Sequence, residues 1–165
     1  MIASVKRRVF YSFHFSEDAW RAGQVRNIGV VEGNEPVTPN DWEAVKRGGD
    51  TAIKRWIDGQ LQGRTCTVVL VGAQTSQRPW VEHEIVESWN RGMAVLGIRI
   101  HKLLNRDQKS SFAGANPFAS IWLQSGVALS TKVKLYDPAG LDSRGVYATI
   151  SKNVNDWIET AINSR

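Results

Sequence analysis

The sequence predicts a three-layer α/β/α protein with a mostly parallel, five-stranded sheet. Two observations predict this. Short apolar runs rich in β-branched residues alternate with amphipathic stretches along the chain, which is the pattern of right-handed βαβ units with helices on both faces of a sheet. One of these runs, Thr67–Gly72, is unbroken, short and closed by glycine, as expected of a fully buried parallel strand. The 165 residues suit a single domain over 1–165.

The first part of the chain is expected to contain two strands and two helices. Val5–Phe13 forms the first strand, and Ser16, with two acids after it, starts a helix through about Asn27. Gly29–Val31 is at most a short edge strand. Glu32–Asp41 is predicted to be a loop because it contains glycine and two prolines. A second helix is expected from Asp50 to Leu61, before a glycine stop.

The second part continues the alternation after the buried strand. A helix from Pro79 to Gly92, a strand over Ala94–Ile100, a short strand over Lys132–Tyr136 and a last helix from Ser143 or Arg144 are expected. Residues 101–131 have no clear periodicity, and a long segment of this kind is usually functional or contains short elements. Five strands connected in this way predict the flavodoxin-like order 2-1-3-4-5.

Composition and missing motifs exclude several classes of function. The net charge is +5, but the basic residues form no stripe, so no nucleic-acid partner is expected. The single cysteine, Cys66, cannot form an internal disulfide, and no His/Cys pairs have metal-ligand spacing, so no metal site is expected. No signal peptide or membrane span is recognisable, which predicts a cytoplasmic protein without a membrane partner.

Common nucleotide and hydrolase signatures are also missing. The chain has no GxGxxG, no Walker sequence and no GxSxG elbow, which argues against dehydrogenase, ATPase and α/β-hydrolase functions. A receiver domain would need an acidic pair after the first strand and an aspartate after the third. Those places hold Ser12-Phe13-His14 and Gly72-Ala73. We therefore also disfavour a receiver-like or other nucleotide-binding flavodoxin-type domain.

Two carboxylates near the start of the Pro79 helix are candidates for chemistry. Val81, Ile85 and Trp89 make one face of this helix apolar, and Glu84 lies beside that stripe, near the carboxyl end of a buried strand. Glu82 lies in the first turn, where the helix dipole alone favours an acid. Both could be solvated helix-start residues, and spacing does not choose between them.

The segment Trp80-Val81-Glu82-His83-Glu84-Ile85 resembles the catalytic-helix segment of TIR domains, and Arg8–His14 resembles the first TIR strand. The wider pattern over roughly the first hundred residues is similar to the ThsB-type TIR-like proteins of the Thoeris antiphage system. The resemblance implies that Glu84 is the catalytic glutamate. Phe13, His14 and Trp80 are further candidates for the substrate pocket and Ser76 for a polar contact. His14 fits a ligand contact or a loop histidine equally well.

The resemblance also implies a reaction. TIR enzymes cleave the nicotinamide–ribose bond of NAD, which is a substrate here and not a cofactor. The Thoeris likeness implies a cyclic ADP-ribose isomer that diffuses as a second messenger to a separate effector in antiviral defence. Homo-oligomers through TIR–TIR contacts are expected, because the loop over Pro36–Asp41 matches the assembly loop of the family and seven tryptophans are many for this length. The alternative is a TIR-like scaffold without enzymatic activity that acts by homotypic assembly.

Overall fold

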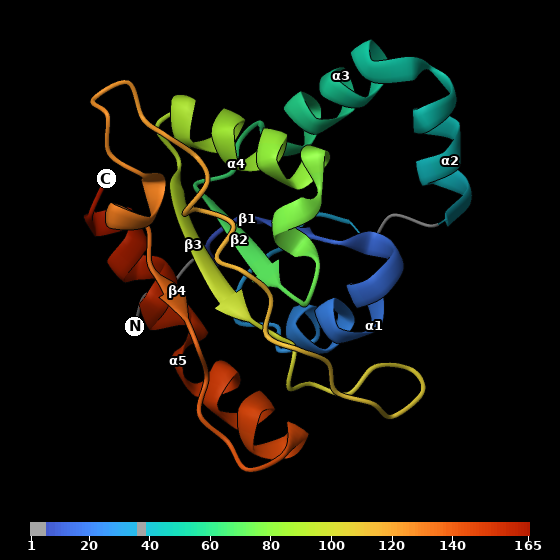
Figure 1. Ribbon diagram of the computed structural model, residues 1–165, viewed down its shortest axis with the longest axis vertical. Coiled ribbons are helices and arrows are strands. Elements are labelled where there is room, and N and C mark those ends of the chain that lie inside the picture. The colour runs from blue at the N-terminus through green and yellow to red at the C-terminus, as the bar shows by residue number, and fades with distance from the viewer. Residues whose placement is uncertain (1–5, 36–38) are drawn as a thin grey trace.

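The chain forms an α/β fold around a parallel sheet (Figure 1). The computed structural model describes residues 6–35 and 39–165. In this part of the chain four strands are hydrogen-bonded in the order β1-β2-β3-β4. The strands are β1 (Val9–Phe13), β2 (Cys66–Val71), β3 (Ala94–Arg99) and β4 (Leu135–Tyr136). The helices are α1 (Phe15–Arg26), α2 (Pro39–Arg47), α3 (Gly49–Leu61), α4 (Pro79–Asn90) and α5 (Ser143–Asn163), with 3₁₀ turns η1 (Thr75–Gln77) and η2 (Leu129–Thr131).

All three strand pairs are parallel, so the carboxyl ends of the strands meet at one edge. Cys66 of β2 pairs with Val9 of β1 on one side and Ala94 of β3 on the other. Gly97 of β3 pairs with Leu135 of β4. The loops that follow β1 and β2 are therefore brought together at this edge, which is where open α/β sheets bind ligands.

The prediction of a five-stranded sheet is wrong, since the described residues contain four strands. The expected strand at Gly29–Val31 is reduced to an isolated parallel bridge between Arg8 and Glu32. Gly29 has a positive φ of 78°, which turns the chain before a ladder can extend. The bridge still places this segment beside β1, on the side opposite β2.

Two other predicted boundaries are shifted. The Lys132–Tyr136 strand retains only its last two residues, because the preceding segment coils into η2 and Val133 N–H donates to the Leu129 carbonyl at 3.0 Å. The predicted Glu32–Asp41 loop ends early, because α2 begins at Pro39, a residue well suited to the first turn of a helix. Residues 1–5, which include the predicted start of the first strand, and residues 36–38 lie outside the described part.

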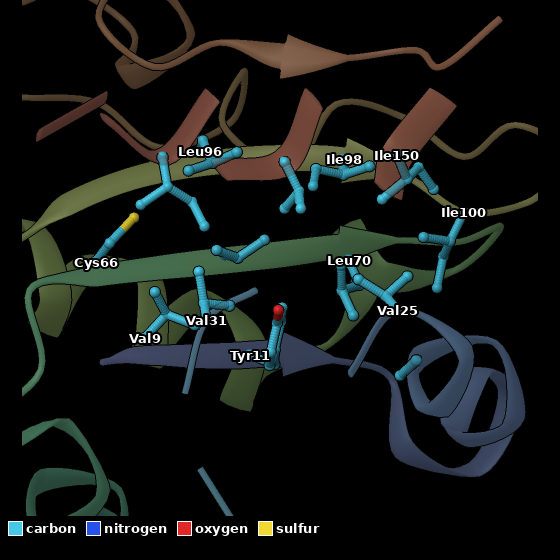
Figure 2. Packing of buried hydrophobic residues seen from close by; sticks show 14 of the residues in the cluster. Val9, Tyr11, Val25, Val31, Cys66, Leu70, Leu96, Ile98, Ile100 and Ile150 are labelled. Atoms are coloured by element: carbon cyan, nitrogen blue, oxygen red, sulfur yellow. The ribbon is translucent and has the colours of Figure 1, made fainter. Parts of the chain in front are cut away.

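Alternation along the strands divides the core between the two faces of the sheet. One face packs against α1 and α5, and Figure 2 shows this layer, with Ile98 of β3 close to Ile150 of α5 and with Leu70 of β2 close to Val25 of α1. The other face packs against α4 through Val69, Val71 and Val95, and against α3 through Phe10. Buried residues between β3 and β4 complete this second face, namely Phe118, Ile121, Leu129 and Val133.

A buried ion pair holds the long segment after β3 against α1. Arg21 Nη1 lies 2.9 Å from Asp18 Oδ1, and both side chains are almost completely buried. The same guanidinium donates to the carbonyl of Leu103 at 2.7 Å and to that of Lys109 at 2.9 Å. Because one cation satisfies a carboxylate and two loop carbonyls, we name this arrangement the Asp18–Arg21 clamp.

Two glycines allow the backbone to approach this clamp closely. A Cβ built on Gly72, directly after β2, would lie 2.1 Å from Asp18 Oδ2. A Cβ on Gly114 would lie 2.3 Å from the Gly72 carbonyl oxygen, and Arg99 donates to the carbonyl of Gly114 at 2.6 Å. The carboxyl end of β2 is therefore packed between α1 and the long segment without room for a side chain.

Replacing Gly72 by alanine tests this packing. The methyl group must displace the buried Asp18 carboxylate, so we expect Gly72→Ala to lower the free energy of unfolding by at least about 2 kcal/mol. Gly23→Ala is the matched control, because Gly23 lies within α1 with no atom within 4 Å of an added Cβ. It should raise stability by about 0.5–1 kcal/mol. Urea unfolding followed by tryptophan fluorescence measures both, and equal midpoints would contradict the packing argument.

Candidate functional site

A cavity of about 480 Å³ lies at the carboxyl end of β1. Its walls come from the β1–α1 junction, the start of α4, and the α2–α3 arm that projects beyond the sheet in Figure 1. The lining is mainly aromatic with a few charged groups. It consists of Phe10, Tyr11, Phe13, His14, Phe15, Ser16, Arg26, Asn34, Trp42, Glu43, Lys46, Trp56, Arg78, Pro79, Trp80, Val81 and Glu84.

The register of α4 turns Glu84 toward this cavity and leaves Glu82 exposed. Val81 and Ile85 are buried against the sheet, which fixes the rotation of the helix. Ser88, one turn after Glu84, donates to the Glu84 carbonyl at 2.6 Å, and its hydroxyl is 2.6 Å from that of Thr67 in β2. This buried hydroxyl pair links the helix to the strand. The structure thus separates the two carboxylates that spacing left equal.

The environment of Glu84 favours its neutral form. Burial raises the pKa of Glu84 from 4.5 to about 8, and the neighbouring Ser12 hydroxyl lowers the pKa by a smaller amount. The residue is half-buried, because it borders the cavity. Ser12 Oγ is itself buried and has no hydrogen-bond partner within 3.5 Å among the described residues, so its contact with the carboxyl group is loose. A carboxyl group with a raised pKa in a cleft is a common property of catalytic sites.

His14, the residue directly before α1, forms part of the cavity wall. Its Nε2 is 2.9 Å from Ser16 Oγ, while its Nδ1 is buried and finds no hydrogen-bond partner among residues 6–35 and 39–165. Burial lowers the pKa of His14, and the nearby Arg78 lowers it further, against the opposing effect of Asp18 and Glu17. The imidazole is therefore neutral at physiological pH.

The aromatic residues of the cavity can hold planar rings. Trp42 of α2 and Trp56 of α3 have ring centroids 5.6 Å apart with their planes tilted by 57°. Phe13 and Phe15 lie 6.4 Å apart at the other wall. Trp80, at the start of α4, contributes a third aromatic surface. Such surfaces suit heteroaromatic ligands, whose rings stack on aromatic side chains.

Cations outnumber carboxylates around the cavity. Lys46 forms a 2.7 Å ion pair with Glu43, while Arg26 and Arg78 have no ion pair among the described residues. Arg78 donates to Gln74 at 2.9 Å, but its Nε is buried without a partner. With Glu84 neutral, three cations face one carboxylate, so the cavity favours an anionic ligand.

Of the five site residues that the sequence predicts, four line this cavity. They are Phe13 and His14 from the end of β1, and Trp80 and Glu84 from α4. Ser76 lies in η1, is half-buried and is not among the lining residues. The sheet topology explains the convergence, because the carboxyl end of β1 and the start of α4, which follows its neighbour β2, meet at the same edge.

Sequence reasoning missed the contribution of α2 and α3 and of the basic residues. Trp42 and Trp56 both pack on the Phe10 cluster and also line the cavity. Arg78 could have been noticed from its place directly before the proline that starts α4. Arg26 and Lys46 carry no local signal, because only the tertiary fold brings them to the cavity.

A metal cluster and a reactive thiol are both missing from the described residues. No cluster of three or more histidine, cysteine, aspartate or glutamate side chains that could hold a metal is present among residues 6–35 and 39–165. Burial raises the pKa of the Cys66 thiol to about 12, so it stays protonated within the core. In the same residues no helix has the length and apolar character needed to cross a membrane.

Comparison with known proteins identifies the family of this chain. Residues 10–105, more than half of the chain, match the family described as "Thoeris protein ThsB, TIR-like domain". The chain is also 36% identical over 117 residues to "Putative cyclic ADP-D-ribose synthase ThsB1" of Bacillus cereus (strain MSX-D12). That match covers 68% of this chain and 61% of the length of the relative. The family match runs from Phe10 of β1 past the end of β3, and it establishes that this chain belongs to the ThsB family of TIR-like domains.

Proposed function

We propose that this protein cleaves the nicotinamide–ribose bond of NAD, with Glu84 as the catalytic carboxylate. The observation that carries this proposal is the position of Glu84, whose carboxyl group borders an aromatic, cation-rich cavity and, unlike Glu43, forms no ion pair among the described residues. A domain that acted only as a scaffold would not need a carboxyl group there, and burying one is costly. The printed name of the Bacillus cereus relative, a cyclic ADP-D-ribose synthase, is consistent with this chemistry.

The reaction needs little catalytic apparatus. The nicotinamide of NAD is a cationic substituent on an anomeric carbon, and it leaves as a neutral molecule with the bonding electron pair, so it requires no general acid. The ribose becomes oxocarbenium-like, as in glycoside cleavage. A carboxylate held beside the ribose hydrogen-bonds its hydroxyl groups and stabilises the developing cation. Glu84 is placed to do this.

The raised pKa of Glu84 is compatible with that role. The empty pocket keeps the carboxyl group mostly neutral, because its pKa is about 8. A bound nicotinamide ring brings a positive charge into the same cavity, and an opposite charge within a few ångströms favours the ionised carboxylate. Substrate binding is then coupled to release of the Glu84 proton. The charge forms in a site with little water, where it acts most strongly on the ribosyl cation.

The rest of the cavity suits the other parts of a dinucleotide. Its volume lies within the range of small-molecule sites, roughly 300–1,000 Å³. Arg26, Lys46 and Arg78 provide positive charge for the diphosphate. The paired tryptophans, Trp42 and Trp56, provide a surface for a base. We assign the product as a cyclic ADP-ribose isomer that diffuses to a separate effector in Thoeris antiphage defence, in line with the family and the relative's name.

The first prediction separates the two carboxylates of α4. Glu84→Gln keeps the size of the side chain but removes the charge that stabilises the ribosyl cation, so nicotinamide release should fall at least about a hundredfold. Glu82→Gln is the matched control, because Glu82 is exposed one half-turn away. It should retain most of the activity. Chromatography of NAD reaction mixtures measures both. A folded Glu84→Gln protein that releases nicotinamide at the wild-type rate would refute the catalytic assignment.

The second prediction uses the pKa of Glu84. The folded protein keeps a proton on Glu84 up to about pH 8, whereas the unfolded chain loses it near the ordinary value of 4.5. Stability from this group is therefore full below about pH 4.5 and is lost as the pH rises to about 8. In the wild type this fall in the free energy of unfolding is on the order of a few kcal/mol, and it does not occur in Glu84→Gln. Its melting temperature should rise relative to wild type between pH 5 and pH 8, by several degrees.

The same series of melting temperatures includes a control variant, Glu82→Gln. The difference in melting temperature between Glu82→Gln and wild type should stay nearly constant over this pH range, since Glu82 is exposed. Effects of all other ionisable groups are common to the variants and cancel in the difference. A Glu84→Gln curve parallel to that of wild type at every pH would show that Glu84 ionises normally in the folded protein.

The third prediction concerns assembly. We propose that the active state is a homo-oligomer, because several aromatic side chains are exposed, among them Trp122, Phe112 and Trp20, and aromatic residues are enriched at protein interfaces. NAD turnover per molecule should then increase with protein concentration. Specific activity is measured over a dilution series spanning about three orders of magnitude, with light scattering on the same samples. A flat profile would exclude a requirement for assembly.

A further inference from the structure

One pair of side chains in the cavity has no part in the departure of nicotinamide. His14 and Ser16 both line the cavity with Glu84, and His14 Nε2 is 2.9 Å from Ser16 Oγ. His14 is 7% exposed, yet its Nδ1 has no hydrogen-bond partner among the described residues. Ser16 is exposed and can be reached from the cavity. A hydroxyl group thus connects the cavity to a buried neutral imidazole.

A purely structural role does not account for this histidine. His14 occupies the N-cap position of α1, but its side chain makes no capping hydrogen bond. Histidine is also not among the residues preferred there. Burying an imidazole nitrogen without a partner is destabilising. In the tautomer with hydrogen on Nδ1, His14 Nε2 accepts a hydrogen bond from the Ser16 hydroxyl group. This is the arrangement of a base that activates an O–H group.

The second half of the proposed reaction needs such a base. After nicotinamide has left, an oxygen nucleophile, either a hydroxyl of the substrate or water, attacks the ribosyl carbon and must lose its proton. Glu84 is engaged with the ribosyl cation and its hydroxyl groups. Burial and the charge of Arg78 keep the imidazole of His14 neutral and able to accept a proton, against the opposing charges of Asp18 and Glu17.

We propose that Ser16 and His14 form a relay that removes the proton from the attacking oxygen. This inference rests on the proposed NAD cleavage. The carbon–nitrogen bond to nicotinamide breaks, and its electron pair leaves with the ring. The new carbon–oxygen bond uses an electron pair of the nucleophile. Its proton passes to Ser16 Oγ as the Ser16 proton passes to His14 Nε2. His14 then returns one proton to solvent, so each turnover yields cyclised or hydrolysed ADP-ribose, nicotinamide and one proton.

Base exchange gives a test that separates this relay from binding. A neutral pyridine such as 3-acetylpyridine attacks the ribosyl carbon through a nitrogen that carries no proton, so exchange needs Glu84 but no base. Transfer of the ADP-ribosyl group to an oxygen nucleophile, called oxygen transfer here, gives the cyclic or hydrolysed product. It needs both Glu84 and a base. The full-length protein is incubated with NAD and 3-acetylpyridine at one high protein concentration. The ratio of exchange product to oxygen-transfer products is measured by chromatography.

The relay predicts a specific pattern of variants. His14→Asn and Ser16→Ala should retain exchange within about threefold of wild type while oxygen transfer falls at least about tenfold, so the ratio rises. Ser16 is exposed, so its variant should fold even if the His14 variant is destabilised. Glu84→Gln should lose both reactions. His101→Asn is the matched control, since His101 is also buried with an unpartnered Nδ1 but lies outside the cavity lining, and its ratio should not change.

Several results would overturn the relay. An unchanged ratio in both variants, or a parallel fall of exchange and oxygen transfer, would give His14 and Ser16 a role in packing or binding only. ADP-ribose attached to Ser16, detected by peptide mass spectrometry, would make Ser16 the nucleophile and not a relay. Wild-type protein that neither exchanges nor consumes NAD would instead overturn the proposed function, and the relay with it.

Discussion

The Asp18–Arg21 clamp is the interaction on which the carboxyl edge of the sheet depends. A buried cation is tolerated only when its hydrogen bonds are satisfied, and Arg21 uses its donors on Asp18 and on two carbonyls of the segment after β3. That segment therefore cannot leave the edge without exposing an unpaired charge to the core. The clamp also fixes the first turns of α1, and the residues that begin this helix form one wall of the cavity. A structural ion pair thus sets the position of groups that it does not touch.

The apolar and polar parts of the cavity wall differ in how well their groups are satisfied by the surrounding protein. Its apolar wall belongs to the core, since Phe10 and Val81 pack beneath it, whereas its polar groups remain incompletely satisfied. His14 and Arg78 line the cavity, Ser12 lies beside Glu84, and each of the three contains a buried polar atom without a partner among the described residues. Such unsatisfied groups lower the stability of the protein, and a bound ligand can supply the missing partners.

The sequence was sufficient for the parts of the fold that are determined locally. The run Thr67–Gly72 and the stripe of α4 each have one strong period, and both elements were predicted close to their observed limits. The segment at Gly29–Val31 was predicted as a strand because of its composition, but whether it pairs over one residue or several depends on a turn that composition does not encode. For the site, the choice of Glu84 over Glu82 came from the resemblance to TIR domains, because spacing along the helix did not separate the two. Lys46 and Arg26 could not be found, because their approach to the cavity depends on how α2 and α1 pack.

The protonation of Glu84 has a consequence for the choice of substrate under the proposed function. A carboxyl group that is mostly neutral in the empty cavity becomes a charged partner only when a cationic ring enters with the ligand. The reduced dinucleotide has the same diphosphate, riboses and adenine, but its dihydropyridine ring is uncharged and leaves the carboxyl group protonated. The pocket would therefore distinguish the two redox forms of one cofactor by charge and not by shape. Consumption would then follow the oxidised fraction of the cellular pool.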